Sequence, residues 1–428
     1  MYKDESRYPL SVLIENAMSE RFFRKITAAT LLLVLLLPGP ADGNAQMPEG
    51  IGNGAVAVGP GARLSVLTVG PADPLYTMFG HTAVRLQDPA RQTDVVYNYG
   101  TFDFETRFFA LKFLYGNLNY FLSKSSFEAF AGANRALGRS IREQVLNLSP
   151  RQVDELIQDM ETELASEDRF YRYEFFRNNC TTKVRDLLAR NQLLMPSRLN
   201  ASSPSETSFR QLLRPYLQRR PWIRLGIDLL LGAPADDTAS KWQQNYLPYM
   251  FYQTLSKAGL PNSIEPLTSE TRLLVPAAAN ARISYWLTPV PVFWVLFLLV
   301  AGITLSGVLK KINAIWLDRI LFGAVGLAGL VLLPVSFLSL HEPLQPNWNL
   351  LWALPTHLVI AAGIKQLQQK SWFRYYMWVT LALHISLLAG WFLIPQQLPA
   401  AVIPLLSALA IRLLFRLIEG GQKSFGRQ

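Results

Sequence analysis

The C-terminal third of this 428-residue chain holds five apolar stretches, each long enough to cross a bilayer as a helix. The connections after the first, third and fifth stretches carry Lys and Arg, whereas 341–348 and 395–397 carry none. Because basic loops stay in the cytoplasm, this alternation predicts that the first span runs inward and that the C-terminus is cytoplasmic. The chain before residue 286 is then expected outside a bacterial inner membrane. The five stretches are 286–309, 316–340, 349–366, 375–394 and 398–418.

The net charge of +10 belongs mostly to this apolar region. From Trp286 onward, ten Lys and Arg face three Asp and Glu, a net +7. The excess of cations is therefore a topology signal, and we expect no nucleic-acid partner. The low charged fraction, 17% against 50% hydrophobic residues, fits a multi-pass membrane protein.

The N-terminus carries an export signal that agrees with the loop charges. Basic residues precede the apolar run 26–37, and Gly43-Asn44-Ala45 is a small-x-small cleavage site. Residues 1–45 are thus predicted to be a signal peptide, followed by a flexible lead-in over 46–61. An uncleaved anchor is the alternative, and it exports the following domain equally.

The exported segment begins with a predicted hairpin. Residues 63–69 are expected to form a strand, a second strand opens at His81, and 94–100 returns beside it after a turn at 88–92. An antiparallel return of this kind brings Asn98 back beside His81.

Further elements follow the hairpin. The aromatic-rich stretch 101–126 is expected either to line an apolar groove or to supply core and membrane-facing surface. Residues 140–148 alternate as a strand, and a capping box at Ser149 starts a helix to about Ala165. The stripe on that helix is Val153, Leu156, Ile157, Met160 and Leu164.

The expected domains are a candidate catalytic domain over 62–208 and a helical extension and linker over 209–285. The extension is helical over 209–260 with a break at 232–236, and 261–280 is expected as a loop. The five-helix transmembrane domain covers 286–420, and 421–428 is a cytoplasmic tail. Within the spans we expect Arg412 to extend to the inner interface, and His357 and His384 to pack between helices or to serve a function.

Cys180 is the single cysteine of the chain, and it lies where an amphipathic pattern starts after two asparagines. Asn178 or Asn179 is a good N-cap, which would put the thiol in the first turn of a helix. The helix dipole and free N–H groups there lower a thiol pKa and favour a nucleophile. The alternative is a cysteine that only packs, because free cysteine is among the most buried residue types.

The candidate chemistry uses His81, the single histidine of the exported segment. One His and one Cys are a poor start for a zinc site, and no G-x-S-x-G motif supports a serine triad. A Cys180–His81 pair accounts for both the cysteine and the histidine of the exported segment. Asn98 is the first candidate to orient the histidine ring, and Asp103 is the second. The N–H of Cys180 and the nearby Asn179 are the candidate oxyanion donors. A hydrogen-bonded histidine at a strand edge is the structural alternative.

Several long motifs give the chain a family resemblance. They are FGHTAVR (79–85), YNYGTFDF (97–104), YGNLNY (115–120), YEFFRNNCTT (173–182) and RLGIDLLLGAPAD (224–236). With these motifs the chain resembles the DUF4105 family, the periplasmic domain of Lnb-type lipoprotein N-acyltransferases. The resemblance implies an α+β permuted NlpC/P60-like (papain-like) periplasmic domain followed by an all-α five-span transmembrane domain.

The resemblance also implies an activity, with the catalytic pair carried over to His81 and Cys180. An acyl chain would pass from a glycerophospholipid through a Cys180 thioester to the N-terminal amine of a diacylglyceryl-cysteine lipoprotein. No cofactor or metal is expected, because the donor is already an ester. The alternatives are a Cys–His amidase or peptidase of the cell envelope and a non-catalytic membrane scaffold.

Overall fold

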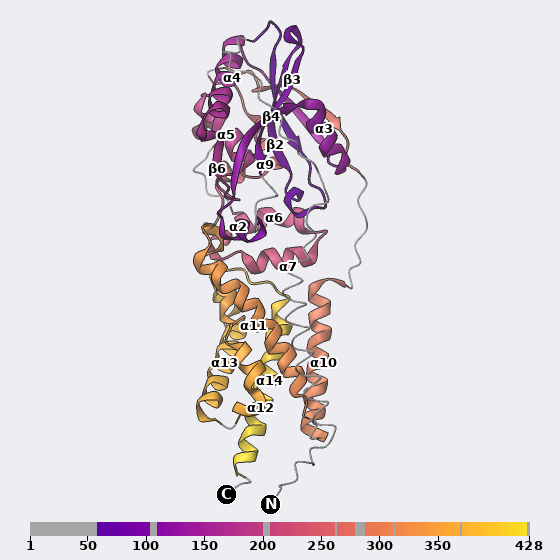
Figure 1. Cartoon of the computed structure of the whole chain (residues 1–428), viewed down its shortest axis with the longest axis vertical. Helices are drawn as coiled ribbons and strands as arrows, with labels where there is room; N and C mark the ends of the chain where they lie inside the picture. The colour runs from indigo at the N-terminus through magenta and orange to yellow at the C-terminus, as the bar shows by residue number, and fades with distance from the viewer. Residues whose placement is uncertain are drawn as a thin grey trace, which may run out of the picture. The chain divides into compact units, whose positions relative to one another are not determined.

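A seven-stranded antiparallel sheet forms the centre of the first described domain (Figure 1). The structure is a computed structural model that describes residues 58–102, 109–199, 206–261, 263–278, 287–310, 313–368 and 370–425. The predicted signal peptide, most of the lead-in and Asp103 lie outside these ranges. Within them the strand order is β6-β4-β3-β2-β1-β5-β7. The strands are β1 Arg63–Val69, β2 His81–Asp88, β3 Thr93–Thr101, β4 Asn119–Ser126, β5 Ile141–Leu146, β6 Phe170–Arg172 and β7 Thr268–Val275.

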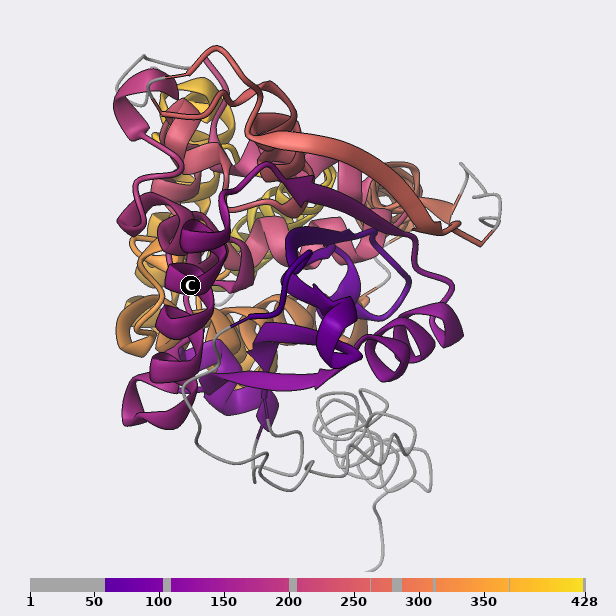
Figure 2. The ribbon, with the colours of Figure 1, turned by 90° about the horizontal axis from the view of Figure 1, so that it is seen from above.

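Helices cover both faces of the sheet, which explains why β1 and β2 are buried over almost their whole length. Alternate residues of β1 contribute to two separate cores: Leu64 and Val66 to one, Leu67 and Val69 to the other. Figure 2 shows α3 (Phe127–Ala136), the helix of the second core, on the opposite side of the sheet from α4 (Pro150–Ala165) and α5 (Cys180–Arg190). The covering helices are α3 Phe127–Ala136 for the second core and α4 Pro150–Ala165, α5 Cys180–Arg190 and α9 Pro248–Lys257 for the first.

Much of this local structure agrees with the sequence patterns. The hairpin of β2 and β3 forms, and α4 starts with the predicted capping box between Ser149 and Gln152. Four residues of its predicted stripe are buried, and Leu164 packs against the same core.

The segment after α5 is mostly helical, with an irregular turn where a break was expected. Its remaining helices within the described residues are short: α6 Phe209–Leu217, α7 Pro221–Leu230 and α8 Lys241–Gln244, with the 3-10 turns η4 Pro196–Leu199 and η5 Ala233–Asp236. Helix α7 begins with Pro at its first position. Before α5 the chain also forms α2 Phe109–Tyr115 and the 3-10 turns η1 Leu75–Thr77, η2 Pro89–Arg91 and η3 Glu167–Arg169.

The expectation that 261–280 is a loop is wrong, because β7 occupies it and pairs with β5 at the edge of the sheet. Half of the β7 residues are exposed, and only Val275 is buried. An edge strand of this kind lacks the apolar alternation that identifies a strand in a sequence. The sheet therefore takes strands from both sides of the expected boundary at 208/209.

Part of the aromatic stretch 101–126 packs into the core. Tyr120 is buried in the core that includes Phe102 and Phe113 at its margin. Its ring stacks on Tyr173 at a centroid distance of 4.3 Å. Phe121 is only half-buried and lies against Phe170, which is exposed. Of the two roles expected for this stretch, Phe102, Phe113 and Tyr120 fill the core one.

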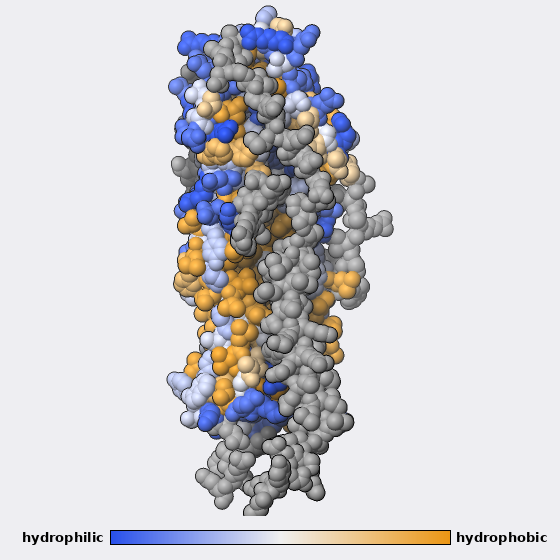
Figure 3. Space-filling view, in the orientation of Figure 1, coloured by the Kyte–Doolittle hydropathy of each residue, from blue (hydrophilic) through white to orange (hydrophobic). Residues whose placement is uncertain are grey.

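Five helices follow in the described C-terminal part, and Figure 3 shows apolar surface over them. They are α10 Pro289–Lys310, α11 Ile315–Leu338, α12 His357–Leu367, α13 Ser371–Ala389 and α14 Val402–Phe425, with the turns η7 Glu342–Leu344, η8 Trp348–Leu351 and η9 Trp391–Leu393. By length and composition, α10 and α11 qualify as membrane spans among the described residues. The third predicted span, 349–366, is helical from His357 only, and 11 residues extend about 16 Å. Five full spans stay a prediction.

Arg412 does not extend to the interface as expected. It is fully buried and binds the buried Asp318 through two hydrogen bonds of 2.6 and 2.8 Å. Arg416 is equally buried and donates to Asp318 at 2.6 Å and to Glu419 at 2.7 Å. A carboxylate within reach makes burial of both guanidinium groups less costly than a partnerless charge. We refer to Asp318, Arg412, Arg416 and Glu419 as the ion cluster.

The two histidines that lie in the predicted third and fourth spans pack against each other. His357 and His384 are both fully buried, and their rings lie 5.4 Å apart between centroids. His357 also binds the carbonyl oxygen of Trp352 at 3.0 Å. This arrangement fits the expected packing between helices.

Candidate active site

The N-terminus of α5 meets the start of β2 and the middle of β3. Cys180 is the first residue of α5, His81 is the first residue of β2, and Asn98 lies in β3. The structure thus brings together three residues that lie 17 and 82 positions apart in the chain. The hydroxyl groups of Thr82 and Thr181 lie 3.1 Å apart and join β2 to α5 beside them.

Asn179 fixes the start of α5. Its Oδ1 accepts from the N–H groups of Thr181 and Thr182, and the Thr182 hydroxyl completes a capping box. Its Nδ2 donates to the carbonyl oxygens of Phe175 at 2.7 Å and Tyr246 at 3.0 Å. Both amide hydrogens therefore have acceptors in this structure, and an oxyanion-donor role for this side chain stays a prediction. Asn179 supports the site by fixing the backbone of Cys180.

Asn98 orients the ring of His81. Nε2 of His81 lies 2.7 Å from Oδ1 of Asn98, and the N–H of Gly100 donates to the same oxygen at 2.9 Å. Since a backbone N–H only donates, the shared atom is the carbonyl oxygen, and Nε2 of His81 must carry the proton. Nδ1 is then the ring nitrogen that is free to exchange a proton with the thiol.

Gly100 makes room for this ring. A Cβ built on Gly100 would overlap Cε1 of His81 and lie 3.0 Å from its Nδ1. Any larger residue would therefore displace the imidazole. Sequence reasoning missed this position, because a glycine at a strand end gives no indication of which side chain will lie against it.

The surroundings of Cys180 favour its thiolate. The residue keeps part of its surface exposed, while its sulfur is packed among protein atoms. Burial raises the pKa of the Cys180 thiol, but the charge of His81, a hydrogen bond with His81, the N–H of Thr82 and the Thr181 hydroxyl lower it. The balance lowers the pKa from 9.0 to about 7. A thiol with this pKa is substantially ionised near neutral pH.

Arg139 is a further charged group near the thiol that sequence reasoning did not find. It is buried, donates from Nε to the carbonyl oxygen of Gly70 at 2.9 Å, and binds Asn134 through Nη1. Burial lowers the pKa of Arg139 to about 10, and interactions with Cys180 and Tyr76 oppose that shift. The guanidinium adds positive potential around the site. Nothing in its local sequence distinguishes it from a surface arginine.

Within the described ranges, no group of three His, Cys, Asp or Glu side chains is placed to hold a metal ion. The chemistry that the described residues themselves offer is that of a thiolate nucleophile, an imidazole and an amide that orients it. Asp103, the second candidate for the orienting role, lies outside the described residues.

Two family models match the chain. One is described as the Lnb N-terminal periplasmic domain and matches residues 60–214, and the other is described as the Lnb transmembrane domain and matches residues 281–424. The chain belongs to the Lnb-type family. No curated protein and no solved structure matched it. The NlpC/P60-like fold therefore stays a prediction.

The two Lnb matches divide the chain in a way that bears on the site. Cys180, His81 and Asn98 all fall in the periplasmic match, and α10 to α14 fall in the transmembrane match. The protein is therefore a membrane protein with a periplasmic domain, and the Cys180 site is on that domain. The Lnb periplasmic match ends inside α6, before β7 adds the last strand to the sheet.

Proposed function

We propose that this protein is a lipoprotein N-acyltransferase that carries the acyl chain on Cys180. The observation that supports this best is the joint placement of Cys180, His81 and Asn98 on the periplasmic domain of an Lnb-type membrane protein. The donor is a glycerophospholipid, and the acceptor is the N-terminal amine of a diacylglyceryl-cysteine lipoprotein. Both substrates are lipids of the membrane that the C-terminal domain occupies.

The first half-reaction acylates the enzyme. The Cys180 thiolate attacks the ester carbonyl, and the tetrahedral intermediate collapses with cleavage of the acyl C–O bond. The imidazolium gives the proton on Nδ1 to the leaving alcohol of the lysolipid. A thioester and a neutral imidazole remain, held in one tautomer by Asn98.

The second half-reaction transfers the chain. The imidazole takes a proton at Nδ1 from the attacking amine as the C–N bond forms, and the thiolate of Cys180 leaves. The product is an amide, and the thiolate–imidazolium pair is restored. Nδ1 thus gives up one proton in the first step and takes up another in the second, while Nε2 remains bound to Asn98.

Stabilisation of the two tetrahedral oxyanions falls to the backbone. At the first position of a helix, the N–H of Cys180 has no partner within the helix, and the helix dipole favours negative charge there. Arg139 contributes long-range positive potential. Asn179 acts indirectly by holding the helix start in place.

Mass spectrometry of a lipoprotein N-terminus tests the proposal directly. A strain that expresses the wild-type chain should yield triacylated lipoprotein, and one with Cys180→Ala should accumulate the diacylated form. A Cys180→Ala chain that is present in the membrane at normal level and still supports triacylation would contradict the mechanism.

The same experiment distinguishes a hydrolase. An envelope amidase or peptidase with this pair would use water as acceptor, so its loss would leave lipoprotein acylation unchanged and alter wall peptides instead. A non-catalytic scaffold would tolerate Cys180→Ala in both assays. Thr181→Val is a matched control, because it alters a neighbour of the thiol without removing the nucleophile and should only reduce the rate.

A further inference from the structure

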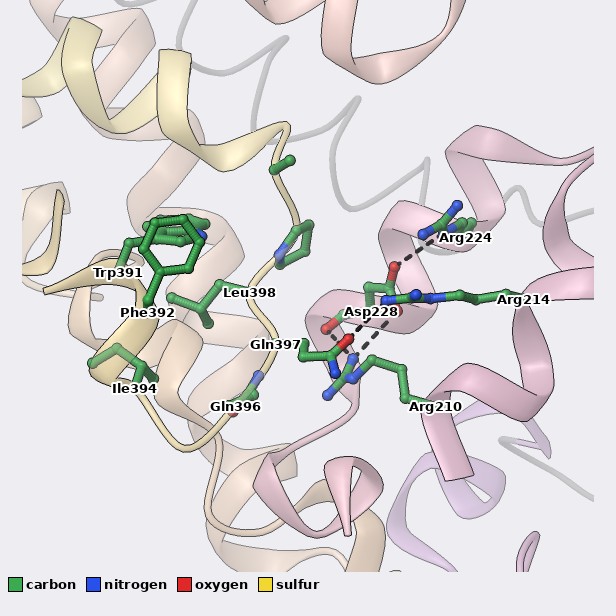
Figure 4. Close-up of a pocket in the computed structure, with 12 residues that line it drawn as sticks. Arg210, Arg214, Arg224, Asp228, Trp391, Phe392, Ile394, Gln396, Gln397 and Leu398 are labelled. Carbon is green, nitrogen blue, oxygen red and sulfur yellow. Dashed lines mark hydrogen bonds and ion pairs between the residues drawn. The ribbon is translucent and has the colours of Figure 1, made fainter. Parts of the chain in front are cut away.

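A cavity of about 350 Å³ lies between the periplasmic domain and the loop that connects α13 to α14. Figure 4 shows arginines from α6 and α7 on one side of it and residues 391–398 on the other. The loop is fixed to the periplasmic domain by hydrogen bonds from Gln396 Nε2 to the Leu231 carbonyl oxygen and from the Gln397 N–H to Asp236. The cavity is thus at the periplasmic end of the membrane helices.

The charges around the cavity leave it positive. The guanidinium donors of Arg210 are all occupied, by the carboxylates of Asp236 and Asp228 and by three carbonyl oxygens. Arg214 has one described hydrogen bond, to the neutral Oε1 of Gln397 at 2.7 Å, and Arg224 pairs with Asp228 at 3.5 Å. Three guanidinium groups therefore face two carboxylates, Asp228 and Asp236, which leaves one positive charge uncompensated. Most donors of Arg214 and Arg224 remain available for an anion.

The opposite wall of the cavity is mostly apolar. Trp391, Phe392, Ile394 and Leu398 line it. The Phe392 side chain is 95% exposed, and the adjacent Leu393 is 86% exposed. Large exposed apolar side chains beside arginines, at the end of membrane helices, are typical of the bilayer interface, where head groups meet acyl chains.

We propose that this cavity binds the phosphate of a glycerophospholipid from the adjoining leaflet, with Arg214 and Arg224 as its ligands and the acyl chains beside Phe392 and Leu393. The one uncompensated positive charge matches the single negative charge of a phosphodiester, and guanidinium groups bind phosphate oxygens with paired N–H donors. The cavity volume suits a glycerophosphate head group. This site is distinct from Cys180, which lies at the sheet.

The role of the site rests on the proposed function, whereas the binding does not. For an acyltransferase, a bound phospholipid at this position would be the donor held before its ester reaches the thiol. The cavity and the Cys180 segment share one packed core, since Phe209 of α6 stacks on Phe176 at 4.8 Å. Arg210 and Arg214 follow Phe209 on the same helix.

Lipid titration of the purified full-length chain, followed by native mass spectrometry, tests the binding. All variants carry Cys180→Ala, so that no lipid is consumed. Phosphatidylglycerol should bind the parent, and Arg214→Gln with Arg224→Gln should weaken binding about tenfold. Diacylglycerol with the same acyl chains lacks the phosphate. It should bind the parent about as weakly as phosphatidylglycerol binds the double variant. The matched control is Arg219→Gln, an exposed arginine outside the cavity, which should leave binding unchanged.

Three outcomes would overturn the inference. Equal binding by the double variant and the parent would show that these arginines are not ligands, provided that thermal unfolding shows both chains folded. Equal binding of diacylglycerol would remove the phosphate from the recognition. Displacement of the lipid by inorganic phosphate at equal concentration would identify a site for the free anion. None of these depends on acyl transfer, which the lipoprotein assay measures separately.

Discussion

At the residue scale, the site depends on how closely one imidazole is held. Three independent features fix the ring of His81: the oxygen of Asn98, the N–H that Gly100 donates to that oxygen, and the space that Gly100 leaves open. The thiol responds to this position, because His81 supplies the largest of the effects that lower the pKa of Cys180. The position of the His81 ring therefore sets how far Cys180 is ionised.

The rate of Cys180 alkylation should rise with pH around a midpoint near 7, since the pKa of the thiol is lowered to about 7. Gly100→Ala should move this midpoint upward. The added methyl displaces the imidazole, and burial, which raises the pKa, then acts with less opposition. Iodoacetamide labelling followed by mass spectrometry measures the midpoint.

Gly132→Ala is the control for that measurement. It adds the same methyl in α3, where a Cβ would meet no atom within 4 Å, so the midpoint should stay near 7. If Gly100→Ala kept the wild-type midpoint, the ring would not be responsible for the ionisation of the thiol.

At the element scale, the residues at the start of α5 contribute more to the site than the rest of the helix does. Asn179 caps the helix and also binds the carbonyl oxygens of Phe175 and Tyr246, so one side chain joins three segments. The cap was predictable, because an asparagine preceding an amphipathic pattern has few other roles. The two carbonyl partners were not, since they depend on how distant segments pack.

Asn179→Ala should destabilise the chain by roughly 2–4 kcal/mol, because it removes a cap and leaves two carbonyl oxygens without their donor. Ser149→Ala removes the exposed cap of α4 and should cost about 1 kcal/mol. Thermal unfolding in detergent compares the two. Similar losses from both changes would mean that the bonds to Phe175 and Tyr246 contribute little.

The sequence patterns were most reliable where a local rule determines the structure. The β2–β3 hairpin put Asn98 beside His81, because its two strands are antiparallel and joined by a short turn. They were unreliable where the partner is distant or the element is exposed. β7 lacks an apolar face, and the third predicted span includes residues that form turns before His357. Arg139 and Gly100 act through neighbours that no local pattern identifies.

At the scale of the whole molecule, the ion cluster is the main polar feature among the described membrane helices. Asp318 of α11 binds Arg412 and Arg416 of α14, and none of the three is exposed by more than 1% on its side chain. Asp318 and Arg412 are 94 residues apart in the chain, and their contact fixes the position of α11 along α14.

Asp318→Asn should destabilise the membrane domain by about 3–5 kcal/mol, because two buried guanidinium groups would then share one remaining carboxylate, that of Glu419. Lys310→Gln, at the exposed end of α10, should change stability by less than about 0.5 kcal/mol. The thermal unfolding midpoint of each chain in detergent measures the effect. An Asp318→Asn chain as stable as the wild type would mean that the cluster is solvated.

A set of hydrogen bonds between α11 and α2 links the transmembrane domain to the periplasmic domain. The end of α11 binds the backbone of α2: the Ser339 hydroxyl donates to Leu114 at 2.8 Å, the Leu340 N–H to Tyr115 at 2.9 Å, and His341 Nε2 to Phe113 at 2.9 Å. Phe113 packs on Tyr173, seven residues before Cys180. These contacts tie the segment that carries Cys180 to the end of α11. In the proposed acyl transfer, the distance that they set between the thiol and the membrane helices would determine which ester bond of a phospholipid reaches Cys180.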